Sequence, residues 1–269
     1  MAKPTLLKKL IYFLQTNGYS DPANEKKGSL NPAAQLLLLP ARIGRVLGVL
    51  RGVYFDHRFD RKHNVNTCGA VYLRDLDIES ENIEFGELYD PFPSGPLKRL
   101  LSFLPQKDLS ETTFVDFGSG KGRILFVAAM HAFRKILGVE FSPELHEVAQ
   151  ANIQSFRSKN QKCHNIESLC EDATQFQIPE GACVFFIFAS FHGEVFTNVL
   201  ENMKRSFLSN PRPIFLLYVT DPNTHPIPWN EIREVGLFRK IRSGAFPFDL
   251  SQRYPLAYAI FEAEDPIKR

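Results

Sequence analysis

Apolar positions follow two alternating patterns through the second half of the chain. Short β-branched and aromatic runs, such as Thr-Phe-Val-Asp-Phe at residues 113–117, predict buried strands, and longer stretches with apolar residues three and four apart predict helices. The predicted strands cover residues 113–117, 135–140, 166–170, 183–189, 213–219, 237–242 and 255–263. The predicted helices cover residues 96–104, 122–133, 143–158, 193–208 and 229–235. This alternation predicts an α/β fold in which helices cover both faces of a mainly parallel sheet.

The N-terminal part has a weaker pattern. Residues 4–16 predict an amphipathic helix, and residues 17–32, rich in Gly, Asn, Pro and Lys, predict a polar loop. Residues 54–95 show no strong periodicity, which predicts a long loop region. We therefore expect two parts, a helical and loop extension over residues 1–106 and an α/β domain over residues 107–269.

Residues 41–52 predict a basic amphipathic helix. Their apolar side chains share one stripe, and the arginines lie largely off it. Such a helix can lie on a membrane surface or can cover the C-terminal domain. We favour the second role because Gly44 and Gly48 weaken the helix in isolation.

A glycine-rich turn follows the strand at residues 113–117. Residues 116–123 read Asp-Phe-Gly-Ser-Gly-Lys-Gly-Arg, and the next predicted strand ends at Glu140. Parallel α/β folds bind nucleosides at such a turn. A dinucleotide site uses G-x-G-x-x-G, whereas these glycines follow G-x-G-x-G, and a Walker-type loop needs Ser or Thr where Gly122 stands. The pattern predicts a site for an adenosine-type cofactor and disfavours NAD.

This turn, together with the acidic end of the next strand, resembles the first two motifs of class I S-adenosylmethionine-dependent methyltransferases. The resemblance extends through Phe-Ser-Pro-Glu-Leu at residues 141–145 and Glu-Asp-Ala at residues 171–173, and it covers residues 109–262. It is greatest to a bacterial-type group that has no assigned substrate. It implies a Rossmann-like, mainly parallel, seven-stranded sheet that ends in an antiparallel pair, with S-adenosyl-L-methionine as the cofactor.

The resemblance also implies roles for individual residues. Asp116 would organise the loop and the methionine ammonium end, and Asp172 with Ala173 would meet the adenine amino group. Glu140 has two acceptor oxygens, which suit a ribose diol. Free N–H groups after Gly122 would meet the methionine carboxylate. The predicted cofactor-binding residues are Asp116, Phe117, Gly118, Ser119, Gly120, Gly122, Glu140, Phe141, Asp172, Ala173 and Ala189.

Two neighbours in the same turn are given no chemistry. We expect Lys121 and Arg123 to face solvent at the start of the helix.

The acceptor side carries a weaker signal. A sulfonium methyl is already activated, so the enzyme mainly aligns the nucleophile and excludes water, and a general base is optional. The fourth strand ends in Ala-Ser-Phe-His at residues 189–192, whereas many amino-methylating relatives carry Asn or Asp followed by Pro-Pro. This departure counts against DNA-base and glutamine N-methylation, and only a loose pattern resembles the histone-lysine methyltransferases. His192 and Tyr89 are the candidate catalytic residues, with a solvated histidine and a packed loop tyrosine as the alternatives.

Composition and charge add limits. The chain is 44% hydrophobic and 23% charged, as in soluble globular proteins, and its four cysteines lack metal-site spacing, so we expect free thiols, no metal and a cytoplasmic location. No secretory signal is visible, and the longest uncharged run, residues 28–41, predicts no integral membrane association. Residues 1–63 hold eleven Lys/Arg and four Asp/Glu, against 21 and 26 in the remainder. Such a basic region can meet nucleic acid, an anionic membrane surface or an acidic protein, although a solvated face is the commoner case.

Three functions remain open at this point. The first is an active methyltransferase that acts on a protein or a small molecule, with the N-terminal extension as a substrate-side cover. The second is a catalytically silent domain that binds S-adenosylmethionine and serves as an interaction module. The third, an NAD-dependent oxidoreductase, is disfavoured by the glycine spacing. We predict the first.

Overall fold

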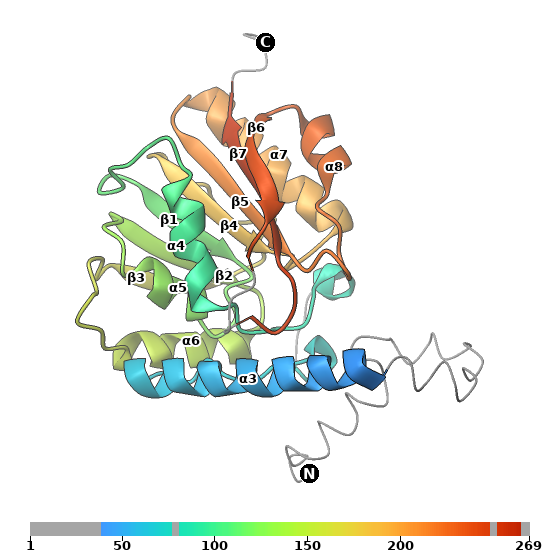
Figure 1. Ribbon diagram of the computed structural model, residues 1–269. Helices are drawn as coiled ribbons and strands as arrows, with labels where there is room; N and C mark the ends of the chain where they lie inside the picture. The colour runs from blue at the N-terminus through green and yellow to red at the C-terminus, as the bar shows by residue number, and fades with distance from the viewer. Residues whose placement is uncertain (1–38, 77–80, 248–251, 265–269) are drawn as a thin grey trace.

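The described residues form one sheet with helices on both faces (Figure 1). A computed structural model describes residues 39–76, 81–247 and 252–264, without the side chains of residues 39–46, Arg74 and Glu81. The helix predicted at residues 4–16 and the loop predicted at residues 17–32 lie outside the described residues.

Seven strands make up the sheet, in the order β3-β2-β1-β4-β5-β7-β6. Strand β7 runs antiparallel to both β5 and β6, and the other neighbouring strands are parallel. The strands are β1 (Thr113–Phe117), β2 (Lys135–Glu140), β3 (Ile166–Cys170), β4 (Cys183–Phe188), β5 (Ile214–Thr220), β6 (Phe238–Ala245) and β7 (Ala257–Ala263). This is the predicted Rossmann-like sheet with its antiparallel edge, and the alternating pattern placed every strand.

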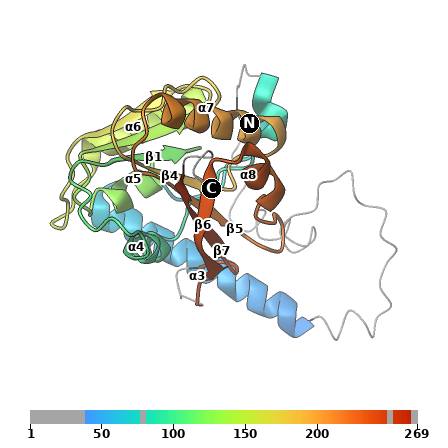
Figure 2. The same ribbon diagram turned by 90° about the horizontal axis from the view of Figure 1, so that it is seen from above.

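The helices cover the sheet in two layers. Figure 2 shows α4 and α7 on opposite sides of the strands. Two buried apolar clusters correspond to these layers, one formed with α4 and α5 and the other with α7 and α8. The helices are α4 (Ser94–Ser102), α5 (Arg123–Ala128), α6 (Pro143–Ser155), α7 (Gly193–Ser209) and α8 (Trp229–Val235). Helix α5 is shorter than predicted because tight i→i+3 turns follow it, with His131 N–H donating to the Ala128 carbonyl at 2.8 Å.

A long helix, α3 (Leu39–His63), crosses one side of the molecule next to α6 (Figure 1). The prediction of a loop over residues 54–95 was wrong for residues 54–63, which belong to α3. The buried positions of α3 include Asp56, Asp60 and His63 beside Phe59 and two glycines, so most of them are not apolar and the apolar periodicity fails. Between α3 and α4, the described residues form two short 3₁₀ helices, η2 (Leu73–Asp75) and η3 (Glu81–Phe85), and no longer helix.

Helix α3 packs against the rest of the described protein, but not through the predicted apolar stripe, since Leu47 and Leu50 are exposed. A Cβ on Gly52 would lie 2.3 Å from Arg253 Cγ, and one on Gly48 would lie 3.1 Å from the Arg253 carbonyl oxygen, so these glycines allow close approach. Phe59 lies in the same apolar cluster as Phe114 of β1. Among the described helices, none has both the length and the apolar character needed to cross a membrane.

Candidate functional site

A cavity lies where β1, β2 and β4 end. The glycine turn forms its floor, and the segment before α4 and the turn after β5 contribute further walls. Ala189, immediately after β4, has φ +39°, an uncommon conformation for a residue with a side chain that marks local strain at this edge. The lining residues include Glu87, Tyr89, Asp90, Phe92, Asp116, Gly118, Ser119, Gly120, Arg123, Glu140, Phe141, Phe188, Ala189, Ser190, Asp221, Thr224, His225 and Tyr254. A smaller pocket adjoins it and shares Gly118, Phe141 and Ser190.

The glycine turn depends on its glycines for two reasons. Gly118, Gly120 and Gly122 have φ of +74°, +53° and +86°, which residues with a Cβ rarely adopt. A Cβ on Gly118 would lie 2.4 Å from the Ser190 Cβ, and one on Gly120 would lie 2.1 Å from the Tyr89 ring. The loop therefore lets neighbouring chain approach closely at the cavity.

The N–H groups of this turn point at the protein itself. Gly118 and Ser119 both donate to the Val139 carbonyl, at 2.9 and 3.1 Å, and Gly120 donates to a Glu140 carboxylate oxygen at 2.7 Å. A pyrophosphate site needs such N–H groups to face the ligand. This arrangement does not suit a dinucleotide, in agreement with the glycine spacing. The N–H groups after Gly122 were expected to meet the carboxylate of a ligand. Those in the first turn of α5 are still candidates for this contact.

Glu140 is held as a buried acceptor at the end of β2. Its Oε2 accepts the Gly120 N–H at 2.7 Å and its Oε1 accepts the Ser142 N–H at 3.0 Å. Burial raises the pKa of this carboxyl to about 7, although the backbone N–H donors oppose the shift. A carboxylate offers about four lone pairs, so acceptor capacity is left for a further donor. The geometry suits a ligand with two adjacent hydroxyl groups.

Two buried polar side chains beside Glu140 have no partner. The Asp116 carboxyl lines the cavity, is 4% exposed, and forms no hydrogen bond or ion pair within the part of the chain that the structure describes. Burial, and then the charge of Glu140, raise the pKa of Asp116 well above its usual range. The Ser119 hydroxyl is also buried and is unpaired among the described residues. Buried polar groups are normally satisfied, so these two suit a ligand with a cationic donor.

The smaller pocket contains the residues predicted for an adenine. Asp172 Oδ1 accepts from the Thr174 backbone N–H at 2.8 Å, and its Oδ2 accepts from the Asn82 amide at 2.7 Å. Phe141 and Ala173 line the same pocket, and Asn82 comes from η3 in the N-terminal part. A flat heterocycle would find an apolar wall and a fixed carboxylate here.

The two candidate catalytic residues occupy different environments. The Tyr89 hydroxyl donates to the Thr67 carbonyl at 2.6 Å, its ring covers Gly120, and burial raises its pKa well above the usual value. Tyr89 therefore acts as a cover of the glycine turn in this structure. His192 is half exposed and lies outside the residues that line either pocket. Its Nδ1 lies 3.5 Å from Glu87 Oε1.

The structure brings together a pair that the sequence did not single out. His225 Nε2 lies 3.1 Å from Glu87 Oε1, and both side chains line the cavity. The hydrogen bond that His225 donates to Glu87 raises the pKa of His225. Glu87 lies in the N-terminal part, where no periodic pattern indicated a functional position. His225 follows the end of β5, and the rule that α/β sites lie at the carboxyl ends of strands could have found it.

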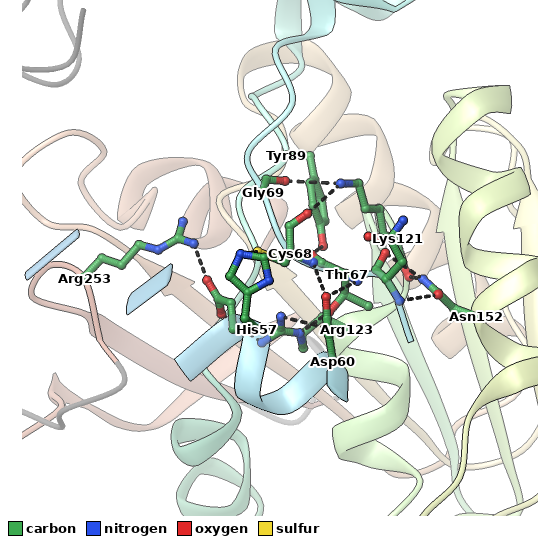
Figure 3. A network of polar contacts seen from close by, with 12 residues as sticks. His57, Asp60, Thr67, Cys68, Gly69, Tyr89, Lys121, Arg123, Asn152 and Arg253 are labelled. Carbon is green, nitrogen blue, oxygen red and sulfur yellow. Dashed lines mark hydrogen bonds and ion pairs between the residues drawn. The ribbon is translucent and has the colours of Figure 1, made fainter. Parts of the chain in front are cut away.

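A buried ionic network attaches α3 to the glycine turn (Figure 3). Arg123 is 3% exposed and pairs with Asp56 at 3.0 Å and Asp60 at 3.3 Å, so the expectation that it faces solvent is wrong. Its guanidinium also stacks over the Phe59 ring at 4.3 Å and donates to the Thr67 hydroxyl. Burial of the Arg123 charge is possible because two carboxylates of α3, more than 60 residues away in the sequence, neutralise it.

The network continues on both sides of Arg123. Arg253 pairs with Asp56 and with Asp90, whose other oxygen accepts the Tyr254 hydroxyl at 2.6 Å. Lys121 is likewise not free in solvent, since its Nζ donates to the Cys68 carbonyl at 2.9 Å (Figure 3). These contacts fix the N-terminal part against the cavity.

The chain is similar to known methyltransferases. Residues 115–209 match the family model described as a methyltransferase domain. A SAM-dependent methyltransferase from Aquifex aeolicus is 17% identical, over 71% of this chain and 97% of that chain, with a TM-score of 0.46. Magnesium protoporphyrin IX methyltransferase from Synechocystis, solved with bound SAM, is 14% identical, over 64% of this chain and 79% of that chain, with a TM-score of 0.41. No curated protein matches the chain.

Proposed function

We propose that this chain, whose residues 115–209 carry a methyltransferase domain, binds S-adenosylmethionine at the cavity and transfers its methyl group to an acceptor. The cofactor supplies a sulfonium methyl that is already activated. The acceptor is a protein side chain or a small molecule. The residues of the chain have to hold the cofactor, align the acceptor and exclude water.

One observation carries the proposal, the pair of buried carboxyl groups at the cavity floor. Glu140 is fixed by two backbone N–H groups with lone pairs to spare, which suits the ribose hydroxyls. Asp116 lies beside it and has no hydrogen-bond or ion-pair partner among the residues that the structure describes, which suits the ammonium of the methionine part. Burying two acids this close is unfavourable without a ligand, so their retention points to one that bears both hydroxyl and ammonium donors.

The smaller pocket supports the position of the other end. Asp172 is fixed by Thr174 and Asn82, so its carboxylate is oriented before a ligand arrives. Phe141 borders both pockets and separates the ribose position from the adenine position. The cofactor would therefore run from Asp116 across Gly118 to Asp172.

The N-terminal part is proposed to cover the acceptor side. Glu87, Asp90 and Phe92 line the cavity, and all three precede residue 107. The ionic network through Arg123 and Arg253 keeps this segment against the glycine turn. Removing the extension should therefore impair the site as well as the packing of α3.

Titration calorimetry with S-adenosylhomocysteine tests the cofactor assignment. The wild type should bind in the micromolar range, and Glu140→Ala should lose that binding. Glu234→Ala, at an exposed carboxylate of α8, is the matched control and should bind as the wild type does. Absence of binding to the wild type, or preference for NAD, would overturn the proposal. Binding without methyl transfer to any acceptor would favour the silent interaction module.

A further inference from the structure

Negative charge dominates the acceptor side of the cavity. Seven ionisable side chains apart from Tyr89 and Tyr254 line it: Glu87, Asp90, Asp116, Glu140, Asp221, Arg123 and His225. Arg123 is neutralised by Asp56 and Asp60 behind the cavity, and Asp90 is paired with Arg253. Under the proposed function Asp116 and Glu140 meet the cofactor, which brings a net charge of about +1 with it. Glu87 and Asp221 are left on the acceptor side, and their field attracts a cation and repels an anion.

Apolar walls accompany these carboxylates. The Phe92 and Phe188 rings meet edge to face with centroids 4.8 Å apart, and both line the cavity with Leu88 and Tyr254. Such walls fit a hydrocarbon stem, and aromatic faces also attract ammonium groups. The combination is selective for an alkylamine over a sugar, a phosphate or a carboxylic acid.

His225 is held in a fixed orientation at this wall. A carboxylate can only accept, so the 3.1 Å contact between Glu87 Oε1 and His225 Nε2 places a proton on Nε2. Nδ1, which lies 3.1 Å from the Thr224 hydroxyl, is then the nitrogen with a lone pair when the ring is neutral. A carboxylate that orients an imidazole in this manner is a recurrent arrangement for proton acceptance.

We propose that the methyl acceptor is a primary alkylamine, such as a lysine side chain, and that His225 accepts its proton at Nδ1 while Glu87 orients the ring. This inference rests on the proposed methyl transfer. An ammonium first loses a proton to Nδ1, because only the free amine has an electron pair. That pair forms the new C–N bond, the C–S pair stays on sulfur, and the secondary ammonium that results keeps its second proton or loses it to solvent.

The charges around His225 support this role. The ring contacts Glu87, the Asp221 carboxylate is close enough to add to the shift, and His192 shares the same Glu87 oxygen at 3.5 Å. The carboxylates raise the pKa of His225, which brings its basicity nearer to that of an alkylammonium and lowers the cost of the proton transfer. In a plot of kcat/KM against pH, the pKa that governs the acid side should therefore lie above the usual histidine value of about 6.5.

Methyl transfer to three small probes of one size tests the acceptor class. The probes are n-propylamine, propan-1-ol and propionate, each offered with S-adenosylmethionine to the full chain, with methylated products measured by mass spectrometry. We expect product from the amine alone. His225→Gln should lower kcat/KM for the amine by about 10²-fold. His164→Gln, at an exposed histidine away from the cavity, is the matched control and should not change it.

Two further measurements separate the role from mere packing. The imidazole pKa of His225, followed by NMR with S-adenosylhomocysteine bound, should fall toward about 6.5 in Glu87→Gln, and the acid limb of kcat/KM should move with it. S-adenosylhomocysteine should bind His225→Gln as tightly as the wild type. Three outcomes would overturn this inference. The first is methylation of propanol or propionate, and the second is the absence of amine product from a protein that binds S-adenosylhomocysteine. The third is a loss of activity in His192→Gln instead of His225→Gln. Failure to bind S-adenosylhomocysteine would instead refute the proposed function.

Discussion

Replacing Glu140 by glutamine tests what the buried carboxyl costs the protein without ligand. Glu140 is 3% exposed and has a pKa of about 7, compared with 4.5 for an unperturbed glutamate. The folded protein therefore holds this proton more tightly than the unfolded chain does. Between pH 4.5 and pH 7 the folded state binds more protons, so the free energy of unfolding falls as the pH rises. Below this window the protonated carboxyl has no such cost.

The size of the effect follows from the shift. The pKa of Glu140 is higher by about 2.5 in the folded protein, and at about 1.4 kcal/mol for each pKa unit this gives roughly 3.5 kcal/mol of lost stability well above pH 7. Asp116 adds to the fall with the same sign, since its pKa is also raised, and it remains in Glu140→Gln. The absolute stability of the variant is not diagnostic, because one of the two N–H donors then faces an amide NH₂. The diagnostic quantity is the change between pH 5 and pH 8.

Urea unfolding of the ligand-free protein at pH 5 and pH 8 measures this change. The wild type should lose roughly 3 kcal/mol more than Glu140→Gln does over that interval. Glu234→Gln, at an exposed position, should behave as the wild type. Equal losses in the wild type and Glu140→Gln would refute the claim that burial of this carboxyl costs stability.

Ligand binding should show the opposite dependence on pH. Ribose hydroxyls donate to the carboxylate form of Glu140, so binding favours the ionised state. The affinity of the wild type for S-adenosylhomocysteine should rise as the pH increases through about 7, by up to tenfold per unit below it. Calorimetry between pH 5.5 and pH 8.5 measures it. A profile that is flat in the wild type, or identical in Glu140→Gln, would contradict the assignment of Glu140 as the acceptor for the ribose.

The remaining predictions concern the attachment of α3 to the rest of the protein. Gly52→Ala should destabilise the protein by about 1–3 kcal/mol because the new Cβ would lie 2.3 Å from Arg253 Cγ. In a helix without such a neighbour, the same change would stabilise by about 1 kcal/mol. If urea unfolding showed a stabilised variant, Arg253 would have to move aside freely. Arg253→Met should cost about 3–5 kcal/mol because it leaves the Asp90 carboxylate without its cationic partner and Asp56 with Arg123 alone. Arg239→Met, whose partners Glu262 and Glu264 are on the surface, should cost much less than Arg253→Met, because exposed ion pairs contribute little. Equal losses for the two arginines would refute the distinction between buried and exposed pairs.

The sheet was predictable because each strand carries its own signal. The central strands β1, β4 and β5 are short apolar runs bounded by turns, and their burial on both faces makes those runs continuous. The cofactor residues follow the same logic. A glycine turn after β1 and an acid at the end of β2 are local patterns, so Gly118, Gly120 and Glu140 could be placed at one cavity without knowledge of the rest of the chain.

Helix α3 and the ionic network could not be predicted in this way. A buried helix face made of Gly52, Asp56 and Asp60 has no apolar period, and burial of these side chains becomes favourable only when Arg123 and Arg253 meet them. Those partners lie more than 60 and almost 200 residues away in the sequence. Local patterns cannot encode a pairing over that distance, so Arg123 at a helix start read as a solvated charge.

The site itself has a part that could be predicted from the sequence and a part that could not. The floor that suits the cofactor comes from strand ends and has a strong local signal, whereas the walls that face the acceptor come from loops. Glu87 and Phe92 lie in the aperiodic segment, and His225 lies in the turn after β5. Loops accept changes in side chains without loss of the sheet, and they are where specificity varies among proteins of one fold. The acceptor of this protein is therefore to be sought through the chemistry of Glu87 and His225, since the glycine turn carries information only about the cofactor.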